Sequence, residues 1–197
     1  MLRTALLRGG GLGRRAWVSL VLGALLSLLV PATGYGAESA ALEYKVKAGY
    51  LFNFAKFIDW PASALPAADS PFIIAVLDAG EAVPVLEPLL AGKNVNGHPV
   101  QVKAVSAASL PKDAHILLVT RAAGKTPEEI RDALGDAPTL LVGETEQFAE
   151  RGGAITFVRE EESVRLNLCL EHTTSAGLKI SAKLANVAKP VKSKRKK

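Results

Sequence analysis

The stretch YKVKAGYLFNFAKFIDWP, residues 44–61, gathers the aromatic side chains of this chain into one segment. It holds six of the eleven Phe, Tyr and Trp residues, and Tyr35 lies just upstream. Large apolar side chains recur every three or four positions, which is the period of a helix that buries one stripe of its surface. The residues of this stripe are Val46, Tyr50, Phe54, Phe57 and Ile58. We therefore expect a core helix that ends before Pro61, because the proline ring disfavours helical geometry at Trp60.

The remaining side chains of this stretch have two expected roles. The charged ones lie between the apolar ones and are expected to stay in water. They are Lys45, Lys47, Lys56 and Asp59. Phe52 and Trp60 lie off the apolar stripe, so they are candidates for binding a partner protein or a ligand. Core packing and a contact surface both stay open for this helix.

Composition and charge indicate an ordinary globular protein. The 197 residues are 49% hydrophobic and 22% charged, which suits a single core. The formal net charge of +5 comes from the two ends of the chain. Without the four arginines of residues 1–37 and the six basic residues of 189–197, 14 basic residues stand against 19 acidic ones. An acidic body with a short basic tail does not resemble a nucleic-acid-binding fold, which spreads positive charge over one face.

The first 36 residues have the pattern of a cleavable secretory signal. Arg3, Arg8, Arg14 and Arg15 precede the apolar run AWVSLVLGALLSLLV, and small residues follow it. The run has 15 residues, fewer than the ~20 that cross a bilayer. Cleavage after Gly36 or after Ala32 fits this pattern, with an uncleaved membrane anchor as the alternative. Cys169 is the single cysteine, so no internal disulfide can form, and its apolar surroundings predict a buried thiol.

Strand-like and helix-like segments alternate over residues 72–150. The expected strands are 72–77, 100–105, 115–120 and 139–143, and the expected helices are 81–90, 126–135 and 144–151. An antiparallel hairpin follows from 154–159 and 164–170, then a last helix over 173–188 with Ala176, Ile180, Leu184 and Val187 on its apolar stripe. The pattern predicts one α/β domain over residues 38–188, with a mostly parallel sheet and an antiparallel edge hairpin. Residues 189–197 are expected to be a disordered basic tail.

Polar residues follow three of the predicted strands and could line a ligand site. They are Asp78, Thr120, Arg121 and Glu144. Ligands of open parallel sheets bind beyond the carboxyl ends of the strands, although polar residues at such places are often only loops. The three histidines lack the spacing of metal ligands, and we expect no metal, no cofactor and no catalytic residues.

Several segments together resemble the YfiR-like periplasmic proteins. They include VKAGYLFNFAKFIDWP, FIIAVLDAG, TLLVGETEQFAERGGAITFV, VRLNLCL and AGLKISAKLANVA. The most specific matching residues are Tyr50, Asn53, Phe54, Lys56, Phe57, Trp60, Pro61, Phe148, Gly152, Gly153, Asn167, Ser181 and Leu184. The resemblance covers essentially all of the chain after the export segment. We expect these residues to be mainly structural.

The resemblance implies a Rossmann-like three-layer fold and a non-enzymatic role. Such proteins sit in the periplasm, bind the periplasmic portion of an inner-membrane diguanylate cyclase and keep it inactive. An outer-membrane lipoprotein captures the repressor, which raises cyclic di-GMP and favours biofilm, and the repressor tends to form a homodimer. Relatives often carry paired cysteines where this chain has Ala75 and Ala114, so redox control is not expected here. The alternative is a periplasmic small-molecule-binding sensor that uses the crevice near Asp78.

Overall fold

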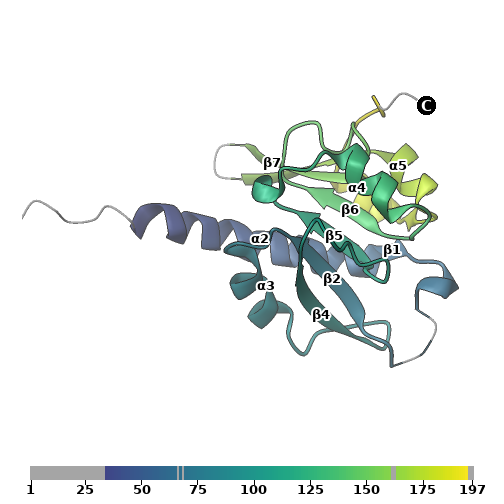
Figure 1. The fold of residues 1–197 in the computed structure, drawn as a ribbon, viewed down its shortest axis with the longest axis horizontal. Coiled ribbons are helices and arrows are strands. Elements are labelled where there is room, and N and C mark those ends of the chain that lie inside the picture. The colour runs from purple at the N-terminus through teal and green to yellow at the C-terminus, as the bar shows by residue number, and fades with distance from the viewer. Residues whose placement is uncertain (1–33, 66, 68, 161–162, 195–197) are drawn as a thin grey trace, which may run out of the picture. The chain divides into compact units, whose positions relative to one another are not determined.

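A long helix, α2, spans Gly34–Phe57 in the computed structural model of the chain (Figure 1). The structure describes residues 34–65, 67, 69–160 and 163–194. The predicted export segment, apart from its last three residues, lies outside the described residues. Residues 34–37 form the first turn of α2, and Glu38–Lys197 form the unit to which the sheet belongs.

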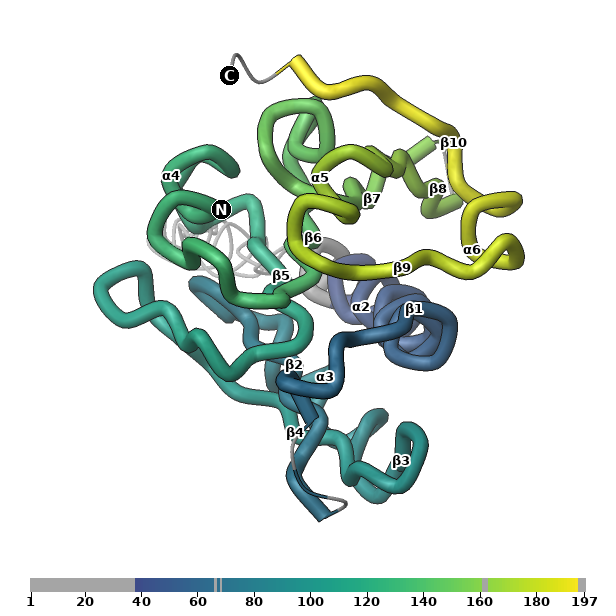
Figure 2. The backbone as a smooth tube through the Cα atoms, turned by 90° about the vertical axis from the view of Figure 1, so that its right-hand side faces the viewer, coloured from purple at the N-terminus to yellow at the C-terminus, as the bar shows by residue number. Residues whose placement is uncertain are grey.

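The chain folds around an eight-stranded sheet with the order β10-β8-β7-β6-β5-β2-β4-β3. The strands are β2 Phe72–Leu77, β3 Asn94–Val95, β4 His98–Val105, β5 Ile116–Val119, β6 Leu140–Gly143, β7 Ile155–Glu160, β8 Ser163–Leu168 and β10 Lys189–Pro190. β4, β2, β5, β6 and β7 are mutually parallel, which confirms the predicted α/β class with a mostly parallel sheet. The sheet curls about α2 (Figure 2).

Helices and apolar clusters lie on both faces of the sheet. The shorter helices are α3 Ala82–Leu90, α4 Pro127–Leu134, α5 Leu170–Ser175 and α6 Ala182–Val187, with single turns η1 Ala62–Ala64 and η2 Arg121–Ala123. On one face, α2 and α3 pack against alternate residues of the central strands, such as Ile74 and Ile116. On the other face, α4 packs against the intervening residues, such as Ala75 and Leu117. The central strands are therefore buried on both sides, as their unbroken apolar runs predict.

The predicted start of α4 is confirmed at the level of single hydrogen bonds. The Thr126 hydroxyl accepts a hydrogen bond from the Glu129 backbone N–H, and the Glu129 carboxylate accepts one from the Thr126 backbone N–H. This reciprocal pair satisfies two donors that a helix leaves free at its first turn. Gly135, at φ +59°, ends the helix as expected.

The buried stripe of α2 differs from the predicted one. Lys47, expected in water, is 1% exposed, whereas Val46, expected in the core, is 43% exposed. The buried side chains of the helix are Lys47, Ala48, Leu51, Phe54 and Ala55. Small alanines let α2 approach the sheet closely, and two carboxylates neutralise Lys47, so the stripe is rotated toward residues that look polar or small in the sequence.

Two predicted helices are wrong in the structure. Residues 144–151 form a series of turns in which Gln147 has φ +59°, a left-handed value that interrupts helical geometry. The predicted helix 173–188 is divided into α5, the short strand β9 Lys179–Ile180, and α6. Gly177, at φ +72°, ends α5, and β9 pairs antiparallel with β1, Ile58–Asp59, directly after α2. Val187, placed on the predicted apolar stripe, is exposed.

The end of the chain and the hairpin also differ from expectation. β7 and β8 pair antiparallel, but β10 lies outside β8 and pairs with it in parallel, so the hairpin does not form the sheet edge. Residues 189–194 of the tail that was predicted to be disordered therefore have a defined position against the domain. Val191 and Lys194 donate backbone hydrogen bonds to the carbonyls of Leu168 and Glu150. Sequence composition missed this contact because it depends on backbone groups of an open strand edge.

Candidate functional site

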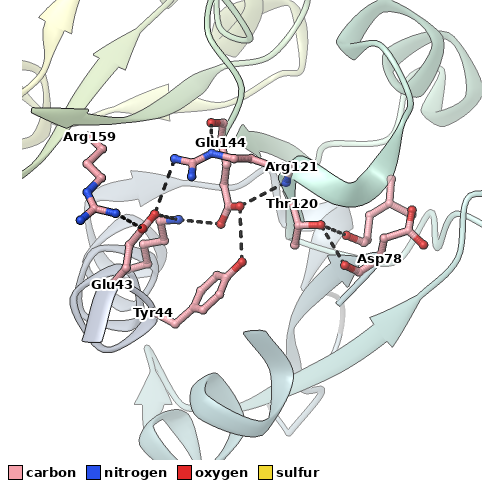
Figure 3. A network of polar contacts seen from close by, with 9 residues as sticks. Glu43, Tyr44, Asp78, Thr120, Arg121, Glu144 and Arg159 are labelled. Atoms are coloured by element: carbon pink, nitrogen blue, oxygen red, sulfur yellow. Dashed lines mark hydrogen bonds and ion pairs between the residues drawn. The ribbon is translucent and has the colours of Figure 1, made fainter. Parts of the chain in front are cut away.

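A cavity of about 240 Å³ lies where β2, β5 and β6 end, under the first half of α2. Its lining includes all four residues predicted for a crevice at the strand ends: Asp78, Thr120, Arg121 and Glu144. Parallel strands bring their carboxyl ends to the same edge of the sheet, which is why these separate positions meet. α2 adds Glu43 and Tyr44 to the same cavity (Figure 3).

Lys47 lies at the centre of the polar network beside this cavity. Its ammonium group is 2.5 Å from the Glu43 carboxylate and 2.7 Å from the Glu144 carboxylate. The Lys47 and Glu144 side chains are almost entirely buried. A charge removed from water is tolerated only with partners, so these contacts are what allow Lys47 to be buried. The network thereby fastens the first half of α2 to the end of β6.

Two arginines extend the network toward solvent. Arg121 donates from its backbone N–H to the Glu144 carboxylate at 3.2 Å and from Nε to the Glu144 carbonyl at 3.2 Å. Its guanidinium lies 3.8 Å from Glu43, and that of Arg159, from β7, lies 3.7 Å from Glu43 on the other side. The carboxylates are covered, while both guanidiniums are half exposed. The accessible charge of the network is therefore positive.

The environment shifts the pKa of two further groups. Burial alone would raise the pKa of Glu43, but its contacts with Lys47 and the two arginines hold that pKa below its ordinary value of 4.5. Burial and the negative charge of Glu144 raise the pKa of Tyr44, whose hydroxyl lies 3.4 Å from the Glu144 carboxylate. Glu43 is thus an anion and Tyr44 a neutral hydrogen-bond donor at neutral pH.

The turn after β2 has a fixed and unusual backbone. Asp78 has φ +50°, a left-handed conformation that aspartate tolerates better than most residues. The Thr120 hydroxyl donates to the carbonyls of Leu77 and Asp78 at 3.1 and 2.8 Å, which ties this turn to the end of β5. Asp78 itself is exposed at the cavity mouth. The two residues therefore shape the rim.

The arrangement offers charged and hydrogen-bonding groups that can bind a charged ligand. Within the described residues, no cluster of His, Cys, Asp and Glu is placed to hold a metal ion. Cys169, the single thiol, is buried directly after β8, and burial raises its pKa, which makes it a poor nucleophile. Of the residues in the network, sequence reasoning missed Glu43, Tyr44, Lys47 and Arg159. The spacing of Glu43 and Lys47, one helical turn apart, was the signal that could have found the pair.

A second, larger hollow of about 620 Å³ runs beside α2. One wall is helix α2, with Leu42, Val46 and Tyr50, and the other is the β7–β8 hairpin, with Arg159 and Val164. Arg159 and Val164 are cross-strand partners, so their side chains lie on the same face of the hairpin. The Tyr50 hydroxyl reaches across to the Val164 carbonyl at 3.3 Å. We call this hollow the α2–β8 groove.

The two aromatic candidates for partner binding are half buried. Phe52 packs against the core, with the ammonium groups of Lys56 and Lys93 at 5.3 and 5.0 Å from its ring centre. Trp60 stands edge-on to Phe72, with ring centres 5.0 Å apart. Both residues contribute to packing, and their role in partner binding stays a prediction.

Comparison with known protein families identifies the family of this chain. The family model described as YfiR/HmsC-like matches residues 44–189, which is most of the chain. The chain belongs to the YfiR/HmsC-like family. This family is regulatory rather than catalytic, periplasmic, and connected with cyclic di-GMP signalling through membrane cyclases. No curated protein matched the chain.

The residues most specific to the YfiR/HmsC-like resemblance lie partly in the core and partly on the surface. Phe148 packs against Gly143 and Gly153, where an added Cβ would meet its ring at 2.2 Å, and Gly152 has φ +131°. Ser181 caps α6 by accepting from the Leu184 N–H. Others pack in or against the core or pair at the strand edge: Tyr50, Phe54, Phe57, Leu184 and Asn167. Asn53 and Lys56 are exposed on α2, and Pro61 is half buried after it.

None of the helices in the described part of the chain combines the length and apolar character needed to cross a membrane.

Proposed function

We propose that this protein is a non-enzymatic periplasmic regulator that binds the periplasmic portion of an inner-membrane diguanylate cyclase and holds the cyclase inactive. The observation that carries the proposal is the family match over residues 44–189, which includes the second half of α2 and the strands from β2 to β8. An outer-membrane lipoprotein that captures the regulator, export through a cleavable signal peptide and a homodimeric state belong to the same proposal. Biofilm formation is the expected output.

Repression of this kind works by differential binding. The regulator binds the inactive arrangement of the cyclase more tightly than the active one and so shifts the population toward it. Moving a cyclase from 1:99 to 99:1 in favour of the inactive state takes about a 10⁴-fold preference. A rigid docking surface suits this task, because little of the binding free energy is then spent on ordering the regulator.

Deletion of the gene tests the proposal. Cyclic di-GMP in the cells is expected to rise and surface attachment to increase, with both restored by the wild-type gene. The full chain and the purified periplasmic portion of each cyclase of the same cell are then mixed and studied by calorimetry. Unchanged cyclic di-GMP together with no binding to any of these portions would overturn the proposal.

A small-molecule sensor is the second candidate function, and the cavity lined by Asp78, Thr120, Arg121 and Glu144 favours it. Its volume of about 240 Å³ is below the roughly 300–1,000 Å³ of drug-sized sites, so only a small ligand would fit. Its main charges already pair with one another. These two facts place the sensor second.

A thermal-shift screen of small periplasmic metabolites separates the two functions. A ligand at a hundred times its dissociation constant stabilises a protein by about 2.7 kcal/mol, which raises the melting temperature by several degrees. The shift is expected to disappear in Arg121→Gln and to persist in Arg165→Gln, which changes an arginine remote from the cavity. A ligand that acts equally on both variants binds elsewhere.

A further inference from the structure

The α2–β8 groove combines accessible apolar side chains with a cationic end. Leu42 is 63% exposed and Val46 43% exposed, although both lie on the helix around which the sheet curls. Tyr50 and Val164 complete the apolar lining. A helix that buries the opposite stripe and still presents such residues at a groove has the form of a docking surface.

The charge at this groove belongs to arginine. Arg159 lines the groove, and toward the described residues it makes only the 3.7 Å ion pair with Glu43, which is longer than a hydrogen bond. Its guanidinium therefore keeps donors for a further acceptor. The Glu43 carboxylate is largely covered. Its negative charge is also neutralised by the buried ammonium group of Lys47. The body of the protein carries an excess of acid, so this exposed positive end stands out.

We propose that the α2–β8 groove is the surface that docks the cyclase, and that it receives an acidic, apolar peptide segment of the partner. Apolar side chains of that segment lie on Leu42, Val46 and Val164, and a carboxylate pairs with Arg159. Arginine presents a planar fork of donors that matches a carboxylate in two hydrogen bonds. The inference rests on the proposed function, because it names the surface through which that function acts.

This location differs from the one that the sequence suggests. Phe52 lies on the flank of α2 that faces Lys93, and it is engaged with two lysines and the core. The groove lies on the flank that faces β8. A partner that binds at the groove therefore does not need to contact Phe52.

Two pairs of variants of the full chain test the groove. Leu42→Ser with Val46→Ser removes the apolar wall, and Leu89→Ser with Val187→Ser removes two exposed apolar residues elsewhere. Arg159→Glu reverses the charge at the groove. Arg165→Glu reverses a neighbouring arginine on the opposite face of the same hairpin, where it makes a similarly weak pair with Glu160 at 3.6 Å. Circular dichroism and melting curves verify that all four variants are folded.

Calorimetry with the purified periplasmic portion of the cyclase, taken at two salt concentrations, gives the answer. Each groove variant is expected to bind at least about tenfold more weakly, the control variants as wild type, and the loss in Arg159→Glu to be largest at low salt. If wild type binds the cyclase and the groove variants bind it equally well, the groove is not the docking surface, and the proposed function stays intact. If wild type does not bind, the proposed function fails.

Other occupants of the groove are measured in parallel. Sedimentation equilibrium of the same four variants shows whether a second copy of the chain occupies it, and flotation with vesicles of phosphatidylglycerol and phosphatidylethanolamine shows whether a lipid surface does. Wild-type self-association or vesicle binding that only the groove variants lose overturns the assignment to an acidic peptide.

Discussion

The two halves of α2 are attached to the sheet by different kinds of interaction. From Ala48 to Phe57 the helix is held by apolar contacts of Leu51, Phe54 and Ala55, with Phe54 stacked on Phe157 at 5.9 Å. From Glu38 to Val46 the described side chains are exposed or half buried, and the ion pairs of Lys47 form the main attachment. The second half can therefore serve as a fixed anchor, while the first half can present a surface whose position depends on charge.

Phe54→Ala is expected to cause the largest loss, because it removes a fully buried ring from the anchor half. Large-to-small changes of this type cost about 3–5 kcal/mol, and the cavity would open between α2 and β7. Urea unfolding of the purified protein measures the loss. Asn53→Ala, an exposed neighbour, is the matched control and should stay within about 0.5 kcal/mol of wild type.

Lys47→Met is expected to cost about 3 kcal/mol, because it leaves the buried Glu144 carboxylate without its cation. The loss should be concentrated in the first half of α2. Amide hydrogen exchange is then faster at residues 38–46, with residues 51–57 nearly unchanged. Uniform acceleration along the helix would show that the two halves do not differ.

A second substitution sharpens the meaning of that result. Lys47→Met combined with Glu144→Gln removes both charges, so most of the lost free energy of unfolding should return. If the double variant is as unstable as the single one, the Lys47 side chain stabilises the fold by its packing rather than by neutralising the Glu144 carboxylate.

The contrast between the halves also explains how far the sequence could be interpreted. The strands, the cap of α4 and the meeting of Asp78, Thr120 and Glu144 follow from local patterns and from the geometry of parallel sheets. The attachment of the first half of α2 to the sheet could not be predicted. The burial of Lys47 depends on its contact with the Glu144 carboxylate, which lies 97 positions further along the chain. Likewise, β9 and β10 depend on backbone pairing with β1 and β8, which side-chain patterns do not record.

Acid is expected to weaken the region after α2 before it weakens the polar network. His115 accepts a hydrogen bond from the Ile73 N–H at Nδ1 and contacts the Ala64 carbonyl through Nε2, both at 3.0 Å, so the neutral ring fits best. Burial lowers the pKa of His115 below its ordinary value of 6.5. The unfolded chain therefore takes up this proton first, and the free energy of unfolding should fall as the pH drops below 6.5.

Glu43 stabilises the fold in its charged form, whereas His115 stabilises it in its neutral form. Its pKa is lowered from 4.5, so its contribution is present above pH 4.5 and is lost only below it. Urea unfolding between pH 7.5 and 4 should show an early decline that His115→Asn removes and a later one that Glu43→Gln removes. A single decline below pH 4.5 would contradict the assignment to His115.

Gly49→Ala is expected to have the smallest effect, and its sign is opposite. Gly49 lies at the junction of the two halves, inside the helix and exposed, with no atom within 4 Å of an added Cβ. Alanine in place of glycine in a helix interior stabilises by about 0.5–1 kcal/mol, because the unfolded chain loses conformational freedom. Hydrogen exchange should slow more at residues 38–46 than at residues 51–57, since a stiffer junction couples the weakly held half to the anchor. Equal slowing on both sides would mean that the glycine only lowers overall stability, and that the first half of α2 moves no more independently than the second.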